Sequence, residues 1–381
     1  MIYLDNSATT RAFEAVTERM CCCMRDSYYN PAAAYGPAVA LERDVNAARM
    51  NLAKLAGHPE GEIVYTSGGT ESNNMAILGS LSATRGKKRI VTSMAEHPSV
   101  YGVIKKLADE GAAEAVFLDT TRTGEIDVDC LSNALTGDTT FVSLMHVNNE
   151  TGAITNIAAA YARIRRLAPN AYFHVDGVQA FMKLPQTCLP CDFYSISGHK
   201  FHAPKGVGAL YLRKGIKFSG GQIGGGQEGG LRSGTLNAPG VLGMDAALLQ
   251  YAKNQAQYIS AMRAAKLRLA ENLCTLPDVA VNGPAPEDGA PHILNLSFLG
   301  VRGEVLLHAL EAKGVLVSTG SACSAHKKGR NRILTSLGLP ASRQESAIRF
   351  SLSPLNTAAE MDEASNIIAE QVAFLRRYQR R

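Results

Sequence analysis

The sequence lacks the features of a membrane, secreted or nucleic-acid-binding protein. No apolar run in its 381 residues reaches the roughly 18 residues that a membrane-spanning helix needs. Its first residues show no basic stretch followed by an apolar one, so we expect no secretory signal. Lysine and arginine exceed the acids by only 5, too mild an excess to indicate a stable nucleic-acid partner. With 46% apolar and 19% charged residues, we expect a globular protein of the cytoplasm.

The eight cysteines do not indicate disulfides, because a reduced compartment keeps cysteine for packing, metal binding or chemistry. Cys21–Cys23 lie in a helical pattern, where three consecutive side chains point in three directions and cannot bind one metal ion. Cys188 and Cys191 have a zinc-like spacing, but His199 and His202 do not follow at zinc-finger distances. The pair also precedes a predicted strand, whereas a thioredoxin-like motif opens a helix. We expect no resident metal ion.

The chain is too long for one hydrophobic core, since single cores stop growing near roughly 250–300 residues. Residues 15–250 alternate short apolar segments with helical patterns, which predicts a parallel sheet with helices on both faces. Residues 251–381, joined by 1–14, predict a smaller α+β domain, with the boundary near 250 inside a helical region. The expected strands of the large domain are 62–66, 89–93, 114–118, 140–146, 171–175, 193–197 and 209–212. Its expected helices are 38–55, 70–84, 98–110, 127–135 and 157–167, and 237–273 is predicted to form two more.

The segment Thr66-Ser-Gly-Gly-Thr-Glu-Ser-Asn-Asn follows a predicted strand and opens a predicted helix. Free N–H groups at a helix start, together with the helix dipole, favour a phosphate group. A turn in which serine and threonine cap the helix explains the same residues equally well. The segment matches neither a Walker A loop nor a dinucleotide fingerprint, so it does not indicate a nucleotide.

An acid and a lysine follow two predicted strands, in His174-Val-Asp-Gly-Val-Gln and Ser195-Ile-Ser-Gly-His-Lys-Phe. Asp176 and Lys200 are both expected at carboxyl ends of strands, where open α/β sheets bind ligands. Pyridoxal phosphate needs a lysine for covalent attachment and a carboxylate that keeps its pyridine nitrogen protonated. Either residue alone is more simply an ordinary loop residue, but the pair with the upstream loop favours this cofactor.

Eight motifs in order make the chain resemble the cysteine desulfurases, which are class V aminotransferases of fold type I. The motifs are Leu4-Asp-Asn-Ser-Ala-Thr-Thr, Thr66-Ser-Gly-Gly-Thr-Glu-Ser-Asn-Asn, Glu96-His-Pro, His146-Val-Asn-Asn-Glu-Thr-Gly, His174-Val-Asp-Gly-Val-Gln, Ser197-Gly-His-Lys, Gly224-Gly-Gly-Gln-Glu-Gly-Gly-Leu-Arg-Ser-Gly-Thr and Gly320-Ser-Ala-Cys-Ser. The resemblance covers nearly the whole chain. It implies a large domain with a mostly parallel seven-stranded sheet and a smaller α+β C-terminal domain.

The resemblance also implies a role for each matching residue. Lys200 is similar to the lysine that holds pyridoxal 5'-phosphate, His97 to the imidazole stacked on its ring, and Cys323 to the cysteine that accepts sulfur as a persulfide. The implied cofactor-binding residues are Gly69, Thr70, Asn149, Asp176, Gln179, Ser197, His199, Lys200 and Thr235. Thr235 would reach the partner subunit of a homodimer. Arg349, assisted by Asn30, resembles the clamp for the substrate carboxylate, which suits a bidentate guanidinium.

The implied activity converts L-cysteine to L-alanine and passes the sulfur from Cys323 to an acceptor protein, for iron–sulfur cluster assembly or for thiolation of tRNA or a cofactor. About ten polar or small residues follow Cys323, which resembles the long-loop desulfurases of cluster assembly. Transient ligation of an iron–sulfur cluster by Cys323 is left open. A selenocysteine lyase, another class V aminotransferase and a non-catalytic sulfur carrier are the alternatives.

The segment 327–332 is unusually basic for such a loop, since relatives are usually neutral and serine-rich there. A solvated surface is the simpler interpretation. The functional hypothesis is that Lys327, Lys328 and Arg330 dock an acidic or RNA-linked sulfur acceptor.

Overall fold

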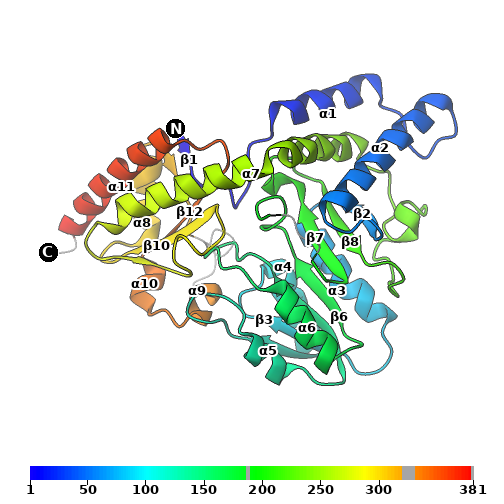
Figure 1. The fold of residues 1–381 in the computed structure, drawn as a ribbon, viewed down its shortest axis with the longest axis horizontal. Helices are drawn as coiled ribbons and strands as arrows, with labels where there is room; N and C mark the ends of the chain where they lie inside the picture. The colour runs from blue at the N-terminus through cyan, green and yellow to red at the C-terminus, as the bar shows by residue number, and fades with distance from the viewer. Residues whose placement is uncertain (186–188, 320–330, 379–381) are drawn as a thin grey trace.

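The computed structural model describes residues 1–185, 189–319 and 331–378. Its centre is a seven-stranded sheet in the order β2-β8-β7-β6-β5-β3-β4, in which β8 runs antiparallel to both of its neighbours and the other pairs are parallel (Figure 1). The strands are β2 (Glu62–Thr66), β3 (Arg89–Ser93), β4 (Glu114–Leu118), β5 (Thr139–Met145), β6 (Tyr172–Asp176), β7 (Phe193–Ser197) and β8 (Gly208–Leu212). The predicted mostly parallel α/β fold is confirmed.

Helices cover both faces of this sheet because its buried side chains alternate between two hydrophobic clusters. Ile90 and Phe141 pack in one cluster, whereas the adjacent Val91 and Val142 pack in the other. The first cluster includes α3 (Gly69–Ala83) and α4 (Pro98–Asp109). The second includes α1 (Glu14–Asp26), α2 (Gly36–Leu55), α5 (Val128–Ala134), α6 (Ile157–Leu167) and the first turns of α7 (Ala238–Cys274).

A separate hydrophobic cluster joins both ends of the chain. It contains Ile2 and Leu4 together with the last turns of α7 and side chains from the C-terminal third. Its elements are β1 (Ile2–Tyr3), β10 (Ile293–Phe298), α8 (Gly303–Glu311), β11 (Val315–Leu316), β12 (Ala347–Ser351) and α11 (Ala358–Tyr378), with β9 (Val279–Val281) packed alongside. β10 pairs antiparallel with β9 and β12, and β1 pairs parallel with β11. Two short helices, α9 (Arg332–Ser336) and α10 (Ala341–Glu345), complete this part.

The expectation of two helices over 237–273 is wrong, because α7 is one helix of 37 residues. No glycine or proline follows Gly243 within it, so the polar stretch near Lys253 does not interrupt the backbone hydrogen bonds. The helix contributes to both clusters, Tyr251 to one and Leu269 to the other. The predicted domain boundary near residue 250 lies inside α7 and stays a prediction. Within the described ranges, no helix combines the length and apolarity that a membrane span requires.

Candidate active site

A cavity of about 320 Å³ opens where the parallel strands end, a volume at the lower end of those that hold small ligands. Strand ends supply its lining because side chains there are free of the sheet and face the crevice. Ten of the residues predicted from the sequence line it. They are Gly69, Thr70, His97, Asn149, Asp176, Gln179, Ser197, His199, Lys200 and Arg349.

Lys200 lies in a short 3-10 turn, η1 (Gly198–Lys200), directly after β7. Its Nζ donates hydrogen bonds to the carbonyl oxygens of Ser7 at 2.7 Å and Ala8 at 2.8 Å. The N-terminal segment therefore holds the amine at the edge of the cavity. This placement suits an amine that forms a covalent bond with a bound aldehyde.

Asp176 ends β6 and is only 2% exposed at the side of the cavity. Its Oδ1 accepts from the Val178 N–H at 3.1 Å and its Oδ2 from Asn73 Nδ2 at 2.8 Å. A carboxylate oxygen has room for a further hydrogen bond, so Asp176 can also accept a hydrogen bond from a protonated ring nitrogen.

His97 caps α4, and its Nδ1 accepts from the Ser99 N–H at 3.2 Å. Ser99 Oγ lies 2.7 Å from the same nitrogen and accepts from Asn73 Nδ2 at 2.8 Å. Because Asn73 also donates to Asp176, its amide joins the acid to the histidine. Burial lowers the pKa of His97, which keeps the imidazole neutral and able to accept a proton.

Sequence reasoning assigned no role to Asn73 and Ser99. Asn73 stands inside a recognised motif, in the first turns of α3, whereas Ser99 directly follows the Glu96-His-Pro motif, two residues after His97. The available signal was the helix start at Pro98, where a serine near the first turn commonly bonds to the capping residue.

The start of α3 suits a phosphate group. Its N-cap residue, Gly68, has no side chain that could accept from the first turn, so backbone N–H groups there are available to a ligand. A Cβ on Gly69 would lie 2.6 Å from Val178 Cγ2, so only glycine fits there. Burial, with the Lys200 ammonium nearby, lowers the pKa of His199 to about 3, so His199 is a neutral hydrogen-bond partner. Ser197 ends β7 on the same side of the cavity.

Arg349 lies on β12, opposite Asn295 of β10, and its guanidinium reaches the cavity. Its Nη2 pairs with Asp5 Oδ1 at 2.6 Å and its Nη1 donates to the Asn149 carbonyl oxygen at 3.0 Å. Two buried atoms at this end have no partner among the described residues, Nε of Arg349 and Oδ1 of Asn149. Unpaired buried polar atoms in a cavity indicate that a polar ligand completes the site.

These observations test pyridoxal phosphate against the residues present, and the residues fit. The cavity offers an amine, an acid for the ring nitrogen, an imidazole and a helix start for the phosphate. Lys200, Asp176, His97, Gly69 and Ser197 are the groups that would hold it.

The segment from Asn331 onward bonds to one sequence neighbour of each of two cavity residues, Asn149 and His97. Asn331 Nδ2 donates to Glu150 Oε2 at 2.6 Å, and Glu150 follows Asn149. Arg332 donates to the Glu96 carbonyl oxygen at 2.5 Å, and Glu96 precedes His97. Arg332 also stacks 3.9 Å above the Tyr101 ring. Burial raises the pKa of Glu150 to about 7.

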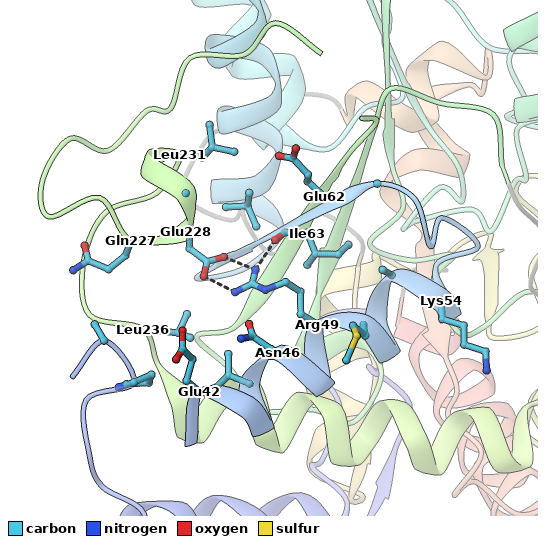
Figure 2. A pocket seen from close by; sticks show the side chains of 18 of the residues that line it. Glu42, Asn46, Arg49, Lys54, Glu62, Ile63, Gln227, Glu228, Leu231 and Leu236 are labelled. Carbon is cyan, nitrogen blue, oxygen red and sulfur yellow. Dashed lines mark hydrogen bonds and ion pairs between the residues drawn. The ribbon is translucent and has the colours of Figure 1, made fainter. Parts of the chain in front are cut away.

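Asn30 and Thr235 do not line this cavity within one chain. Asn30 lines a larger cavity of about 920 Å³ between α2 and the η2 turn (Glu228–Gly230). Figure 2 shows that cavity, where Arg49 pairs with Glu228 at 2.7 Å. Thr235 is exposed, close in sequence to the same cavity. Both assignments stay predictions.

The predicted sulfur acceptor and its basic neighbours cannot be placed. Cys323, Lys327, Lys328 and Arg330 lie outside the described residues. Among the residues that are described, no group of three His, Cys, Asp or Glu side chains is arranged to hold a metal ion.

Comparisons with known proteins define the class. The family model for class-V aminotransferases matches residues 2–363, and the chain belongs to that family. A cysteine desulfurase of Trichormus azollae is 38% identical over 99% of this chain and 94% of its own. The cysteine desulfurase IscS of Escherichia coli O139:H28 is 39% identical over 98% and 93%. A NifS-like protein structure superposes with a TM-score of 0.91 at 33% identity, covering 98% of this chain and 99% of its own.

Within that family, the chain is a cysteine desulfurase that uses pyridoxal phosphate. The predicted family, fold, reaction and cofactor are therefore confirmed. The roles of the individual site residues stay predictions.

Proposed function

We propose that this cysteine desulfurase carries the sulfur that it removes from L-cysteine on Cys323 and passes it to an acceptor protein in the cytoplasm. The observation that carries the proposal is the convergence of Lys200, Asp176, His97 and Arg349 on one cavity. Two of these groups suit the cofactor, one suits a proton transfer and one suits the substrate carboxylate. The likeness to IscS supports iron–sulfur cluster assembly as the destination, and thiolation of tRNA or a cofactor fits the same chemistry.

The side chains divide the reaction between them. When bound, pyridoxal phosphate supplies an electron sink next to the carbon that loses its proton. Arg349 binds the α-carboxylate of L-cysteine and fixes the substrate in the cavity. The neutral imidazole of His97 takes up and returns a proton, and the amine of Lys200 is the second proton carrier.

The sulfur transfer balances without another reagent. The Cβ–S bond of the substrate breaks while its sulfur bonds to the Cys323 thiolate, so the products are L-alanine and a Cys323 persulfide. The carbon that loses sulfur gains a proton and two electrons, and the two sulfur atoms together give up those two electrons.

Variants at Lys200 and Cys323 separate cofactor binding from sulfur transfer. Lys200→Ala should lose the visible absorbance of the bound cofactor. Cys323→Ala should keep the absorbance and lose alanine formation from L-cysteine. Normal alanine and sulfide release by Cys323→Ala would contradict the role of Cys323, and it would favour a lyase reaction that needs no cysteine.

We also propose a homodimer in which Thr235 completes the phosphate site of the partner subunit. Lys200→Ala and Thr235→Val chains, each defective alone, should recover activity when coexpressed, because one site of the hybrid dimer then holds both native residues. Absence of recovery in isolated hybrid dimers would contradict the shared site.

The acceptor is proposed to be acidic where it meets the basic segment. Changing Lys327, Lys328 and Arg330 to glutamate should slow sulfur delivery to the acceptor and leave alanine release unchanged. A persulfide-trapping capture with Cys323 identifies the acceptor. Delivery at the native rate by the reversed-charge variant would contradict the docking role.

A further inference from the structure

Lys183 is a fully buried lysine that the mechanism above does not use. It is 1% exposed and follows β6 in a series of turns that begins at Gly177. Burying an ammonium group costs stability unless several acceptors surround it. The described contacts give its Nζ one acceptor, Gln179 Oε1 at 3.3 Å. A group so costly to bury, next to the cavity, points to a function.

Lys266 provides the contrast within the same chain. It is also 1% exposed, but its Nζ donates to two backbone carbonyl oxygens, those of Gly289 at 3.3 Å and Ala290 at 2.8 Å. Two loop carbonyls explain Lys266 as a structural lysine. Lys183 bonds instead to a side chain that lines the cavity.

The bond from Lys183 fixes which way the Gln179 amide faces. An ammonium group can only donate, so it selects the oxygen of the amide and leaves the nitrogen on the other side. Gln179 Nε2 then donates to the Ser7 carbonyl oxygen at 2.9 Å, the same oxygen that accepts from Lys200 at 2.7 Å. The second hydrogen of Nε2 remains for a ligand in the cavity.

We propose that Lys183 is a positioning residue that presents the Gln179 amide to the cofactor as a donor. This inference rests on the proposed role of Gln179 toward the phenolic oxygen of pyridoxal phosphate. A donor stabilises negative charge on that oxygen and so weakens its hold on the proton that it shares with the Lys200 nitrogen. Without Lys183 only the Ser7 carbonyl oxygen keeps the amide from turning its oxygen inward, and in the turned state the proton is held more tightly.

The positive charges near Lys183 lower its pKa, as its burial does. Lys200 and Arg349 lie near enough to oppose its protonation, and burial is the largest of the effects that put its pKa well below the usual value. Three histidines are the other titratable neighbours: His199, His202 and His292, and His292 is buried without a partner for either ring nitrogen among the described residues. A neutral amine still donates to Gln179 but can also accept, so Lys183 selects the amide oxygen most strongly while it is protonated.

The test measures the pH midpoint of the visible absorbance of the bound cofactor, in Lys183→Met and the matched control Lys266→Met. The midpoint should rise by about one pH unit in Lys183→Met and stay at the native value in Lys266→Met. Thermal melts of the cofactor-free proteins should show Lys183→Met at least as stable as the native chain, since an apolar isostere replaces a buried amine. Lys183→Leu replaces it if Lys183→Met does not fold.

A double-variant cycle with Gln179→Leu shows whether Lys183 acts through Gln179. Gln179→Leu alone should raise the midpoint, and adding Lys183→Met should raise it no further. An unchanged midpoint in Lys183→Met beside a shifted one in Gln179→Leu would overturn the inference and leave the role of Gln179 intact. Equal shifts in both lysine variants, or a full Lys183 effect without Gln179, would also overturn it. No shift in Gln179→Leu would overturn both assignments.

Discussion

Ser99 and Asn73 determine how His97 faces the cavity. Ser99 bonds to Nδ1 of the ring, and Asn73 holds Ser99 against Asp176, so the proton of the neutral ring lies on Nε2. Both side chains line the cavity, and their hydrogen bonds go to His97, to Asp176 and to each other. Their effect on catalysis passes through the tautomer and orientation of His97.

Ser99→Ala should therefore slow proton transfer while leaving substrate binding intact. We expect kcat for alanine formation to fall by about tenfold and KM to change by less than about twofold. Ser80→Ala is the matched control, because Ser80 is a buried serine of α3 whose hydroxyl bonds only to carbonyl oxygens of its own helix. A native kcat in Ser99→Ala, or an equal loss in the control, would contradict this account.

Among the elements, α9 depends on one side chain for its start. Asn331 Oδ1 accepts from the N–H groups of Ile333 at 2.9 Å and Leu334 at 3.1 Å, while its Nδ2 donates to Glu150. The cap and the contact with Glu150 therefore use different atoms of one amide.

Two substitutions separate these roles. Asn331→Ala removes both and should lower the local stability of α9 by about 1 kcal/mol, whereas Asn331→Ser keeps a capping oxygen. Hydrogen exchange at Thr335, Ser336 and Leu337 should accelerate in Asn331→Ala and change less in Asn331→Ser. The same acceleration in both variants would show that Glu150, and not the cap, holds the helix.

The sequence allowed most elements of the large domain to be predicted, because its strands are short apolar runs separated by helical patterns. β2, β3, β4, β7 and α6 have the predicted bounds. The missed elements are the two-residue β1 and the three-residue β9, together with the five-residue α9 and α10. Segments this short carry no readable periodicity.

The sequence predicted the site residues that stand in local motifs, and it missed the contacts between residues far apart in the chain. Asp176 and Lys200 stand at strand ends, which periodicity locates. The bond from Lys200 to the Ser7 carbonyl spans 193 positions and uses a backbone atom that any residue supplies. The contact between Lys183 and Gln179 is local, but only burial distinguishes that lysine from an exposed one.

For the whole molecule, buried histidines make folding sensitive to acid. His174 is sandwiched in the central sheet, with Nδ1 2.8 Å from Ser143 Oγ and Nε2 2.9 Å from Ser195 Oγ. Burial lowers its pKa to about 3. Between that value and the unfolded value of about 6.5, the unfolded chain binds a proton that the folded chain does not. The contribution of His174 to stability is complete above pH 6.5 and is lost as the pH falls.

Replacing this histidine should flatten the pH dependence of unfolding. In His174→Gln, the decrease in the free energy of unfolding on acidification from pH 6 to pH 4 should be smaller than in the native chain by up to about 1.4 kcal/mol per pH unit. Urea unfolding at several pH values measures it. Glu150 acts with the opposite sign between its unfolded pKa and about 7, so the comparison is made between the two proteins at each pH. Parallel profiles would contradict a neutral buried His174.

The central claim is that Lys200, held at the edge of the cavity by the N-terminal segment, is the lysine that binds the cofactor. Borohydride reduction of the holoenzyme makes the bond between the cofactor and its lysine permanent. Proteolysis and mass spectrometry then identify the modified lysine. We predict one phosphopyridoxyl group per chain, on Lys200, and none on the buried Lys183. Attachment at any other lysine, or an unmodified Lys200 in yellow protein, would contradict the account.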